Sequence, residues 1–446
     1  MAAAGSSSSN KRAWVLDVEK TLKEADKSVE VSRWERHCIY RVLACIKDIK
    51  SKAYQPQVVS LGPFHHGDPN LLPMEEHKRR ALRHLLRRAG RPLDHFVAAV
   101  EDAAELLESA YMDLGLEWRR TGRERFLEMM IVDGCFLLEV MRTTAGKNVD
   151  DYASNDPIFS THGILYMVPY IKRDMLMLEN QLPLLLLQKL NAVETGKPPN
   201  DDFINRMVLR FLAPSSRLLQ PGIGLGLHPL DVFRRSMLFG EYQKIPNSKD
   251  TQDNDIIRSA VELYEAGIGF KMSKSSSLHD IQFRHGVLSM PTVPVDDSTE
   301  YMFLNMMAFE RLHVGAGNDV TAYVFFMDNI IDSAKDVALL SSKGIIQNAV
   351  GSDKAVAKLF NSISRDVVLE QYSALDAVQR QVNGYFRQPW NMWRANLIHT
   401  YFRSPWAFLS LAAAVFLLVM TIMQTVYTVL PFYRQDGSPP SAPSPM

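Results

Sequence analysis

Cysteine and glycosylation acceptors are what this sequence conspicuously lacks. Only three cysteines, Cys38, Cys45 and Cys135, occur among its 446 residues. That number is too small for a disulfide framework and suits a reducing compartment. No Asn-x-Ser/Thr acceptor is present, and residues 1–12 have no apolar stretch typical of a secretory signal. These absences favour a body that resides in the cytosol.

Net charge and familiar catalytic motifs are also missing. Fifty basic residues balance fifty acidic residues, so no overall field attracts nucleic acid or another polyanion. The chain has no His-Glu-x-x-His or Cys-x-x-Cys spacing, no Walker Lys-Ser/Thr loop and no Gly-x-Ser-x-Gly turn. The sequence therefore assigns no catalytic residue, no cofactor-binding residue and no metal ligand.

What the sequence does contain is one long uncharged run near its C-terminal end. Ser404 to Tyr433 includes no charged residue, and most of its side chains are apolar. A helix over residues 406–430 is roughly 37 Å long, enough to cross a hydrocarbon core of about 30 Å. We expect a transmembrane helix over 405–430 and a disordered, Pro/Ser-rich tail over 431–446. A buried core helix is the alternative, although such helices seldom extend this far without a polar face.

The flanks of this run predict its orientation in a membrane. Arg394, Arg403 and Trp406 flank it on the body side, whereas Arg434 is the only basic residue beyond it. Positive flanks resist translocation and are attracted to anionic lipid. We therefore expect a single-pass protein, anchored near its C-terminus in the plasma membrane, with a cytosolic body. An extracellular body, translocated by the anchor itself, is the alternative.

Helical spacing dominates the body. Segment 74–89 begins after Pro73 and stops at Gly90, and a strongly apolar helix is expected from Phe126 to Val140. The sequence predicts a mainly α fold: a large helical globular body with a small β insertion, plus one C-terminal transmembrane helix. The other expected segments are a flexible N-terminus with a leading helix over 1–29, the helical body over 30–400, sub-boundaries at 195–202, 214–228 and 244–254, and a β element over 267–294.

A basic amphipathic helix is expected around Arg79, Arg80, Arg83 and Arg87. A solvated helix face is the preferred interpretation of this run of charge. Contact with anionic lipid is the alternative that suits an anchored protein. No aromatic residue is interleaved among these cations, so a nucleic-acid site is not expected.

A pair of adjacent histidines, His65 and His66, lies near several carboxylates in the sequence. Imidazoles and carboxylates are suitable metal ligands, but adjacent histidines on a Gly/Pro-rich loop usually point in different directions. A structural loop at a sharp turn is the preferred interpretation. An enzyme would require both histidines to meet a carboxylate in a common pocket, and the candidates are Asp68, Asp133 and Glu179.

Three polar residues, Glu179, Asn180 and Gln181, lie between leucine-rich stretches and just before Pro183. Proline breaks or restarts a helix, and the polar residues then bond the backbone groups that the break frees. A ligand-binding site is the alternative, because buried polar groups without partners are unfavourable. The residues that form the candidate functional or structural signature are His65, His66, Glu75, Asp133, Glu179, Asn180 and Gln181.

A series of short blocks along the chain matches a known pattern. These blocks are Ser60–Gly67, Met74–Lys78, Phe126–Glu139, Asp156–Phe159, Asp174–Pro183, Glu265–Lys271, Asn305–Glu310, Asp328–Asp332, Gly344–Ile346 and Tyr401–Trp406. In this order they resemble the signature of the plant domain-of-unknown-function-247 family, over roughly residues 30–430. Leu43, where a proline is expected, and Ser109-Ala110, where an arginine is expected, depart from that signature. The resemblance implies a plant, membrane-anchored and mainly helical protein.

Two classes of function follow. The preferred one is a membrane-tethered recognition protein that binds an as yet unidentified protein partner, in signalling, self-recognition or defence. Some members of the family that it resembles are implicated in pollen–stigma self-recognition in grasses, and most have no assigned activity. The alternative is an enzyme of unfamiliar type that uses the histidine and acid cluster around His65 and His66. Lipid binding through the basic helix is a third, minor interpretation.

Overall fold

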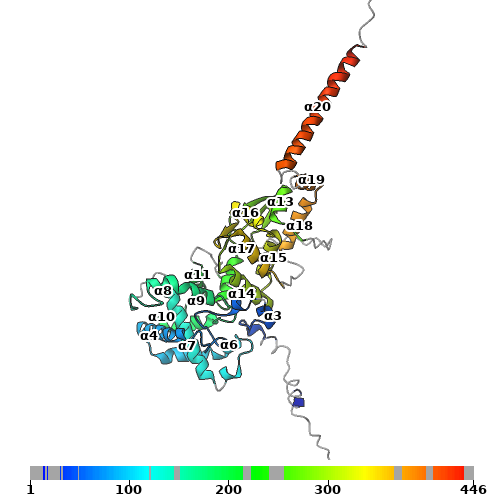
Figure 1. The fold of residues 1–446 in the computed structure, drawn as a ribbon. Coiled ribbons are helices and arrows are strands. Elements are labelled where there is room, and N and C mark those ends of the chain that lie inside the picture. Colours follow the sequence, from blue (N-terminus) through cyan, green and yellow to red (C-terminus); the bar gives the residue numbers. More distant parts are fainter. Residues whose placement is uncertain are drawn as a thin grey trace, which may run out of the picture.

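Two helical lobes form the body, and one long helix extends away from the second lobe (Figure 1). The predicted mainly α fold is confirmed, because helices make up most of the described chain and its strands are few and short. This computed structural model describes residues 14, 15, 18, 31, 34–48, 50–119, 122–144, 151–213, 222, 224–240, 256–365, 374–397 and 405–435. Most of the expected 1–29 segment and the whole 244–254 boundary lie outside these residues.

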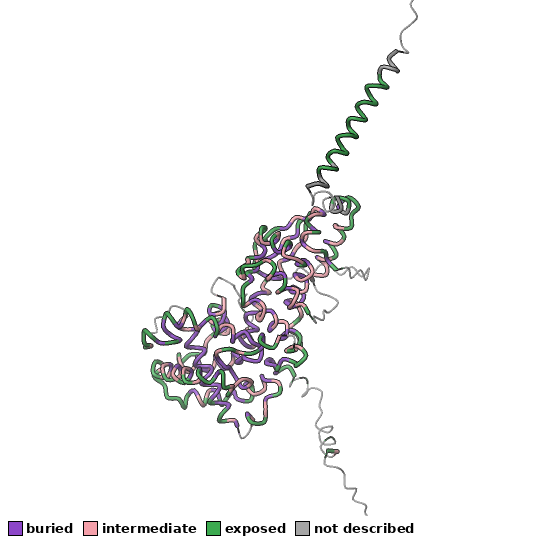
Figure 2. The backbone as a smooth tube through the Cα atoms, in the orientation of Figure 1, coloured by how far each residue is buried: buried purple, intermediate pink, exposed green. Residues whose placement is uncertain are grey.

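The first lobe is built around one helix that has no polar face. Helix α7 is buried at nearly every position between Phe126 and Met141 (Figure 2). Helix α4 starts at Pro73 and stops at Gly90, whose positive φ of 62° closes the last turn through an N–H bond to Leu86 O (3.0 Å). The elements of this lobe are α4 Pro73–Ala89, α5 Leu93–Asp102, α6 Ala104–Ser109, η2 Leu116–Trp118, α7 Arg123–Thr144, α8 Thr161–Tyr166, α9 Val168–Asp174, α10 Leu184–Thr195 and α11 Asp201–Leu212.

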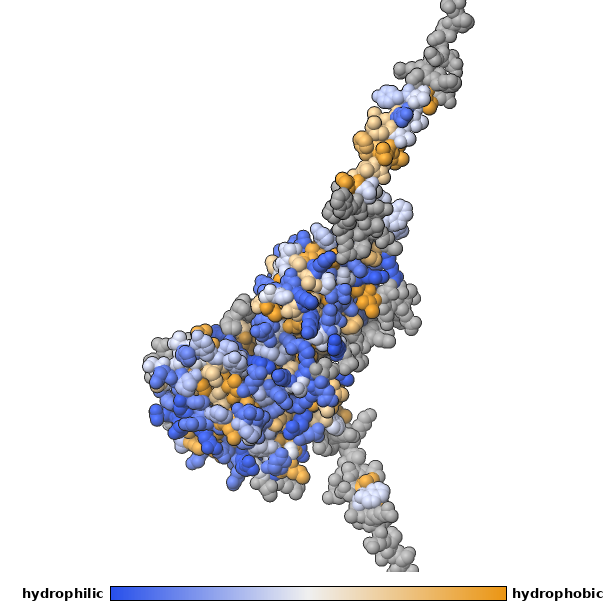
Figure 3. Space-filling model, in the orientation of Figure 1, coloured by the Kyte–Doolittle hydropathy of each residue, from blue (hydrophilic) through white to orange (hydrophobic). Residues whose placement is uncertain are grey.

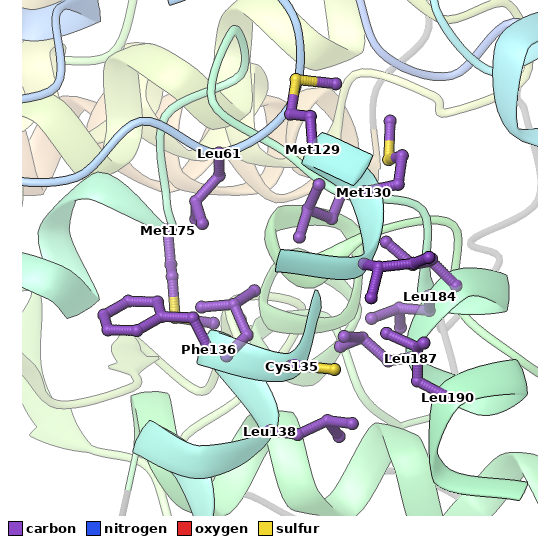
Figure 4. Close-up of a cluster of buried hydrophobic side chains, with 14 of the residues drawn as sticks. Leu61, Met129, Met130, Cys135, Phe136, Leu138, Met175, Leu184, Leu187 and Leu190 are labelled. Carbon is purple, nitrogen blue, oxygen red and sulfur yellow. The ribbon is translucent and has the colours of Figure 1, made fainter. Parts of the chain in front are cut away.

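A glycine allows α7 and α10 to lie close together. A Cβ atom added at Gly134 would lie 2.4 Å from Leu190 Cδ1 and 3.2 Å from Leu186 Cδ2. The apolar side chains around this crossing include Leu184, Leu187 and Leu190 of α10 and Leu138 of α7 (Figure 4). The close approach therefore depends on the absence of a side chain at Gly134.

The second lobe combines helices with two small sheets. Strand β3 lies between β1, which is parallel to it, and β2, which is antiparallel to it. Strands β4 and β5 form a separate parallel pair. The elements are α12 Pro229–Met237, α13 Ala260–Glu265, β1 Gly269–Met272, β2 Gln282–Arg284, β3 Val287–Met290, β4 Val293–Val295, α14 Thr299–Leu312, α15 Asp319–Ile330, α16 Ala334–Ser342, β5 Ile346–Asn348, α17 Asp353–Ile363 and α18 Ala374–Phe386.

The two lobes are joined along the segment from Cys38 to Val42. Cys38 and Ile39 belong to the first hydrophobic core, whereas Tyr40 and Val42 belong to the second. Ile39 pairs with Tyr111 in an isolated parallel bridge. The short elements α3 (Ala44–Lys47) and η1 (Ser51–Tyr54) follow, and η1 packs against α14. Among the predicted sub-boundaries, 195–202 falls between two helices of the first lobe, and 214–228 precedes α12.

The C-terminal helices are α19 (Pro389–Leu397) and α20 (Pro405–Gln435). Helix α19 packs against α13 of the second lobe. Helix α20 continues through Pro431 to Gln435, five residues further than the predicted end at 430, so the expected disordered tail over 431–446 starts too early. The fixed φ of Pro431 is compatible with a helix, and no glycine interrupts the chain before Gly437. Ala412–Leu430 is the one described stretch that is long and apolar enough to cross a membrane.

Candidate functional site

Several buried polar side chains surround a loop that we call the cradled loop, residues 57–62. The Asp174 carboxylate, at the end of α9, accepts hydrogen bonds from the backbone N–H groups of three successive loop residues. The N–O distances are 2.9 Å for Gln57, 2.7 Å for Val58 and 2.9 Å for Val59. Burial raises the pKa of Asp174, and these three bonds oppose that rise. A buried loop without such acceptors would leave its donors unsatisfied.

Asn180 continues the support of the cradled loop. Its Oδ1 accepts from Leu61 N at 2.7 Å, and its Nδ2 donates to Val59 O and to Asp174 O, both at 3.0 Å. The amide is fully buried and uses both its acceptor and its donors. Asn180 therefore holds two parts of the chain that lie about 120 residues apart in sequence.

A buried ion pair closes the other end of the cradled loop. Lys78 of α4 donates to Asp133 Oδ1 at 2.7 Å, to Glu75 Oε1 at 2.6 Å and to Ser60 Oγ at 3.1 Å. Asp133 Oδ2 accepts from Gly62 N at 2.9 Å. Burial raises the pKa of Asp133, and the adjacent Lys78 ammonium group opposes this effect. The pair thus connects α4, α7 and the loop.

Glu179 bonds the segment that joins the lobes. It accepts from Val42 N at 2.6 Å and from Lys47 Nζ at 2.7 Å, and its Oε2 lies 3.4 Å from His65 Nε2. Burial alone would raise the pKa of Glu179, but the interactions with His65 and Lys47 outweigh it and lower the pKa. The side chain is therefore a charged acceptor with three partners.

Gln181 bonds backbone groups of the segment before Pro183 and of the first turn of α12. Its Nε2 donates to Met175 O at 2.6 Å and Met177 O at 2.7 Å, and its Oε1 accepts from Leu230 N at 3.0 Å. The backbone of Gln181 also lies close to Gly62. A Cβ atom at Gly62, where φ is 73°, would lie 2.9 Å from Gln181 O, so this position requires glycine. Pro183 caps the start of α10.

The two histidines do not meet in a common pocket. His65 faces Glu179, whereas the His66 ring contacts Trp118 edge-on, with ring centroids 5.3 Å apart. Asp68 instead caps its own loop by accepting from Asn70 N at 2.9 Å. Within the described part of the chain, no group of three or more His, Cys, Asp or Glu side chains is arranged to hold a metal ion. This geometry supports the interpretation of the cluster as a structural loop.

The arginines of the basic helix α4 fall into two groups: some bond carboxylates of the body, and others are exposed to solvent. Arg80 donates to Asp156 Oδ1 at 3.0 Å, and Arg88 forms two bonds to the Glu139 carboxylate, at 2.8 and 2.7 Å. Arg83 and Arg87 are exposed. Of the arginines proposed to contact lipid, Arg80 therefore has a structural role, and Arg79, Arg83 and Arg87 face solvent.

Part of the predicted membrane flank is described. Arg394 is exposed on α19, and its guanidinium lies over the backbone of Gly267, where a Cβ atom would be 2.7 Å from Arg394 Nη1. Trp390 and Trp393 are 78% and 71% exposed. Arg403 and the side chains of Trp406 and Arg434 lie outside what the structure describes.

Sequence reasoning did not identify several members of these networks. Asp174 is the first residue of the block Asp174–Pro183, and Lys78 belongs to a run of mostly exposed basic residues, so neither was singled out. His228 is fully buried at the lobe junction, where Nδ1 accepts from Asp231 N at 3.2 Å and Nε2 donates to Cys38 O at 3.0 Å. Burial lowers the pKa of His228 to about 4. No local sequence pattern distinguishes these residues from solvated ones.

Comparisons with known proteins agree with the resemblance found in the sequence. A family profile described as "Plant protein of unknown function" (DUF247) matches residues 39–420. The chain is 31% identical to the UPF0481 protein At3g47200 of Arabidopsis thaliana, over 95% of this chain and 93% of the relative. It is 24% identical to the putative UPF0481 protein At3g02645 of the same plant, over 92% and 93%. No solved structure gives a significant match.

Proposed function

Since this chain belongs to the DUF247 family of plant proteins, we propose that it is a single-pass membrane protein whose helical body binds a protein partner at one bilayer face. We further propose that this binding acts in signalling, self-recognition or defence, as the sequence analysis suggests. We also propose that the membrane is the plasma membrane and that the body lies on its cytosolic side.

The observation that carries the membrane part is the exposure of α20 over residues 412–430. Residues 412–430 have a mean hydropathy of 2.0, and none of this stretch is buried against the body. Hydrophobic residues gather along the middle of the projecting helix (Figure 3), and Leu417 and Leu418 are 64% and 61% exposed. Each such side chain gains roughly 1.5–3 kcal/mol on leaving water. If α20 were a core helix, its apolar side chains would be buried against the rest of the protein.

The polar groups of α20 are compatible with a lipid environment. The hydroxyl of Thr421 donates to Leu417 O at 2.8 Å, that of Thr425 to Thr421 O at 2.8 Å, and that of Thr428 to Gln424 O at 2.7 Å. A spanning helix must satisfy its polar groups internally because the hydrocarbon core offers no water. These three bonds meet that requirement one turn apart along the helix.

Helix α19 is suited to the bilayer surface. Trp390 and Trp393 are three positions apart, so both indoles lie on one side of the helix, and both are exposed. Indole rings favour the headgroup region, and Arg394 beside them favours the anionic cytoplasmic leaflet. This combination supports a body that begins at the cytosolic surface.

The partner-binding part is supported by an exposed apolar surface on the first lobe. We call it the α8–α9 patch, and it includes Leu165, Tyr166 and Tyr170, which are 64%, 57% and 49% exposed. Clustered exposed apolar side chains typically mark binding surfaces, and tyrosine is enriched in them. A membrane tether would raise the effective concentration of such a surface near a membrane-bound partner.

Contact of Arg79, Arg80, Arg83 and Arg87 with anionic lipid is a lesser proposal. Helix α4 lies in the first lobe, at the end of the body away from α19 (Figure 1). One bilayer would reach both helices only if the body lay along its surface. Arg80 would also have to leave Asp156.

The topology is tested by protease protection on sealed microsomal vesicles that carry the full chain with a different tag at each end. We expect protease to remove the N-terminal tag and to leave the C-terminal tag on a short protected fragment that includes α20. Detergent should then expose that fragment as well. A protected N-terminal tag in sealed vesicles would contradict the cytosolic body.

A further inference from the structure

The first lobe contains a hollow whose lining includes no residue of the cradled-loop network. It has a volume of about 260 Å³ and lies between α7, α10 and α11. Leu138 and Met141 of α7 and Phe203 and Met207 of α11 form its apolar lining. Leu138 and Met141 are buried, whereas Phe203 is 44% exposed. The hollow is therefore apolar inside and accessible from solvent along α11.

One buried amide opens into this hollow. Asn191 of α10 is only 6% exposed and is part of the lining, yet its side-chain amide has no hydrogen bond to any residue that the structure describes. Its backbone oxygen is used by the Thr195 hydroxyl, at 2.8 Å, so that neighbour does not satisfy the side chain. Because Asn191 lines the hollow, its amide can bond a polar atom of a ligand held there.

Two arginines give the hollow a positive charge. Arg206 and Arg210 line it from α11, one turn apart, and both are exposed and form no ion pair within the described chain. Arg142, across from them on α7, is bonded to Glu139 (2.8 Å) and also to Glu194. No carboxylate is among the residues that line the hollow. A ligand with a negative group would therefore meet two uncompensated cations.

We propose that this hollow binds a small aromatic carboxylate. Its volume lies between the ~150 Å³ cavity that admits benzene and the ~300 Å³ lower range of drug-sized pockets, which suits roughly a dozen non-hydrogen atoms. Methionine sulfur and phenylalanine favour an aromatic ring over an aliphatic chain. The ring occupies the apolar lining, the carboxylate meets Arg206 and Arg210, and a polar atom of the ligand bonds Asn191.

Calorimetric titration of the full chain in lipid nanodiscs with 2-naphthoate tests this site, with empty nanodiscs subtracted. The neutral probe 2-naphthamide has the same shape and lacks the charge. We expect 2-naphthoate to bind about tenfold more tightly than 2-naphthamide. The double variant Arg206→Gln/Arg210→Gln should remove that advantage and leave 2-naphthamide binding unchanged. Met207→Trp, which fills the hollow, should weaken the binding of both probes.

The matched control is Arg83→Gln/Arg87→Gln, a pair of exposed arginines with the same spacing on α4. Both arginine pairs are at the surface, so all these proteins should fold, which thermal unfolding checks. The control should bind 2-naphthoate as the unmodified chain does. Equal affinity for the two probes, equal loss in the two arginine variants, or no binding above empty nanodiscs would each overturn the proposal. The result is independent of membrane topology.

Discussion

The ammonium group of Lys78 lies 2.7 Å from Asp133 Oδ1, and neither side chain reaches solvent. The pair joins two helices of the first lobe to the cradled loop, because Asp133 also accepts from Gly62 N. Its partners are more than fifty residues apart in sequence. The central loop of this lobe is therefore held by charge as well as by apolar packing.

Lys78→Met should destabilise the body strongly, because it leaves the Asp133 carboxylate buried without its counter-ion. We expect a loss of about 3–5 kcal/mol in the free energy of unfolding. Lys78→Met/Asp133→Asn should recover much of that loss, since the asparagine oxygen still accepts from Gly62 N. Equilibrium urea unfolding in mild detergent measures both. Arg79→Met, at the exposed neighbouring position, should change the free energy by less than about 0.5 kcal/mol; an equal loss in that control would refute the special role of the pair.

Gly134→Ala should separate α7 from α10, because its methyl group would meet Leu190 at 2.4 Å. Inserting a methyl group into such a contact typically costs about 1–3 kcal/mol. Gly384→Ala is the matched control: Gly384 also lies within a helix, but nothing lies within 4 Å of an added Cβ atom there. The control should be neutral or more stable by up to about 1 kcal/mol. Thermal unfolding of both variants separates the two outcomes, and equal melting temperatures would contradict the packing described.

Acidification should weaken the junction of the lobes through His228. Burial lowers its pKa from 6.5 to about 4, so between these values the unfolded chain binds a proton that the native chain does not. The contribution of His228 to the free energy of unfolding is therefore fully present above pH 6.5. It is lost as the pH falls, and the loss reaches roughly 3 kcal/mol at pH 4. His228→Gln, which keeps a donor for Cys38 O, should flatten the dependence. Urea unfolding across this pH range measures it, with the exposed His285→Gln as control; an unchanged slope in His228→Gln would contradict the assignment.

The α8–α9 patch should be required for partner binding. Tyr166→Glu/Tyr170→Glu places two charges on a surface that now exposes both rings. Proximity labelling from the body in intact plant cells should lose specific neighbours in this variant. Leu116→Glu/Val314→Glu changes two isolated apolar residues that are 83% and 96% exposed, and it should keep the neighbours of the unmodified chain. Identical labelling profiles for the two variants would exclude the patch as the binding surface.

Local signals in the sequence were sufficient for much of the fold. Pro73 and Gly90 bracket α4 because one fits the first helical turn and the other a left-handed cap. The β element over 267–294 contains β1, β2 and β3. Strand β5 was not predicted, because three residues paired with a strand some fifty positions earlier carry no periodic signal. Helix α20 extends five residues beyond the predicted end at 430, because the composition of the Pro/Ser-rich tail does not show at which residue the helix stops.

The candidate site was less predictable than the fold. The sequence marked Glu179, Asn180 and Gln181 as polar groups in an apolar context, but it did not show their partners: Asn180, for example, bonds Leu61 of the cradled loop, about 120 residues away. Such distant pairing depends on the tertiary fold. The cluster around His65 and His66 was suggestive only because its residues are adjacent in sequence, and the structure directs the two rings to different neighbours, Glu179 and Trp118.

Alkaline carbonate extraction of membranes from plant cells tests the central claim, the membrane anchor, most directly. Val419 and Met423 are one turn apart near the middle of α20, and about half of each side chain is exposed. Arginine at each position costs about 2.5–3.5 kcal/mol on insertion, whereas leucine at both is a matched apolar control. The unmodified chain and the leucine control should stay in the pellet, and Val419→Arg/Met423→Arg should be released. Release of the unmodified chain into the soluble fraction would contradict the account.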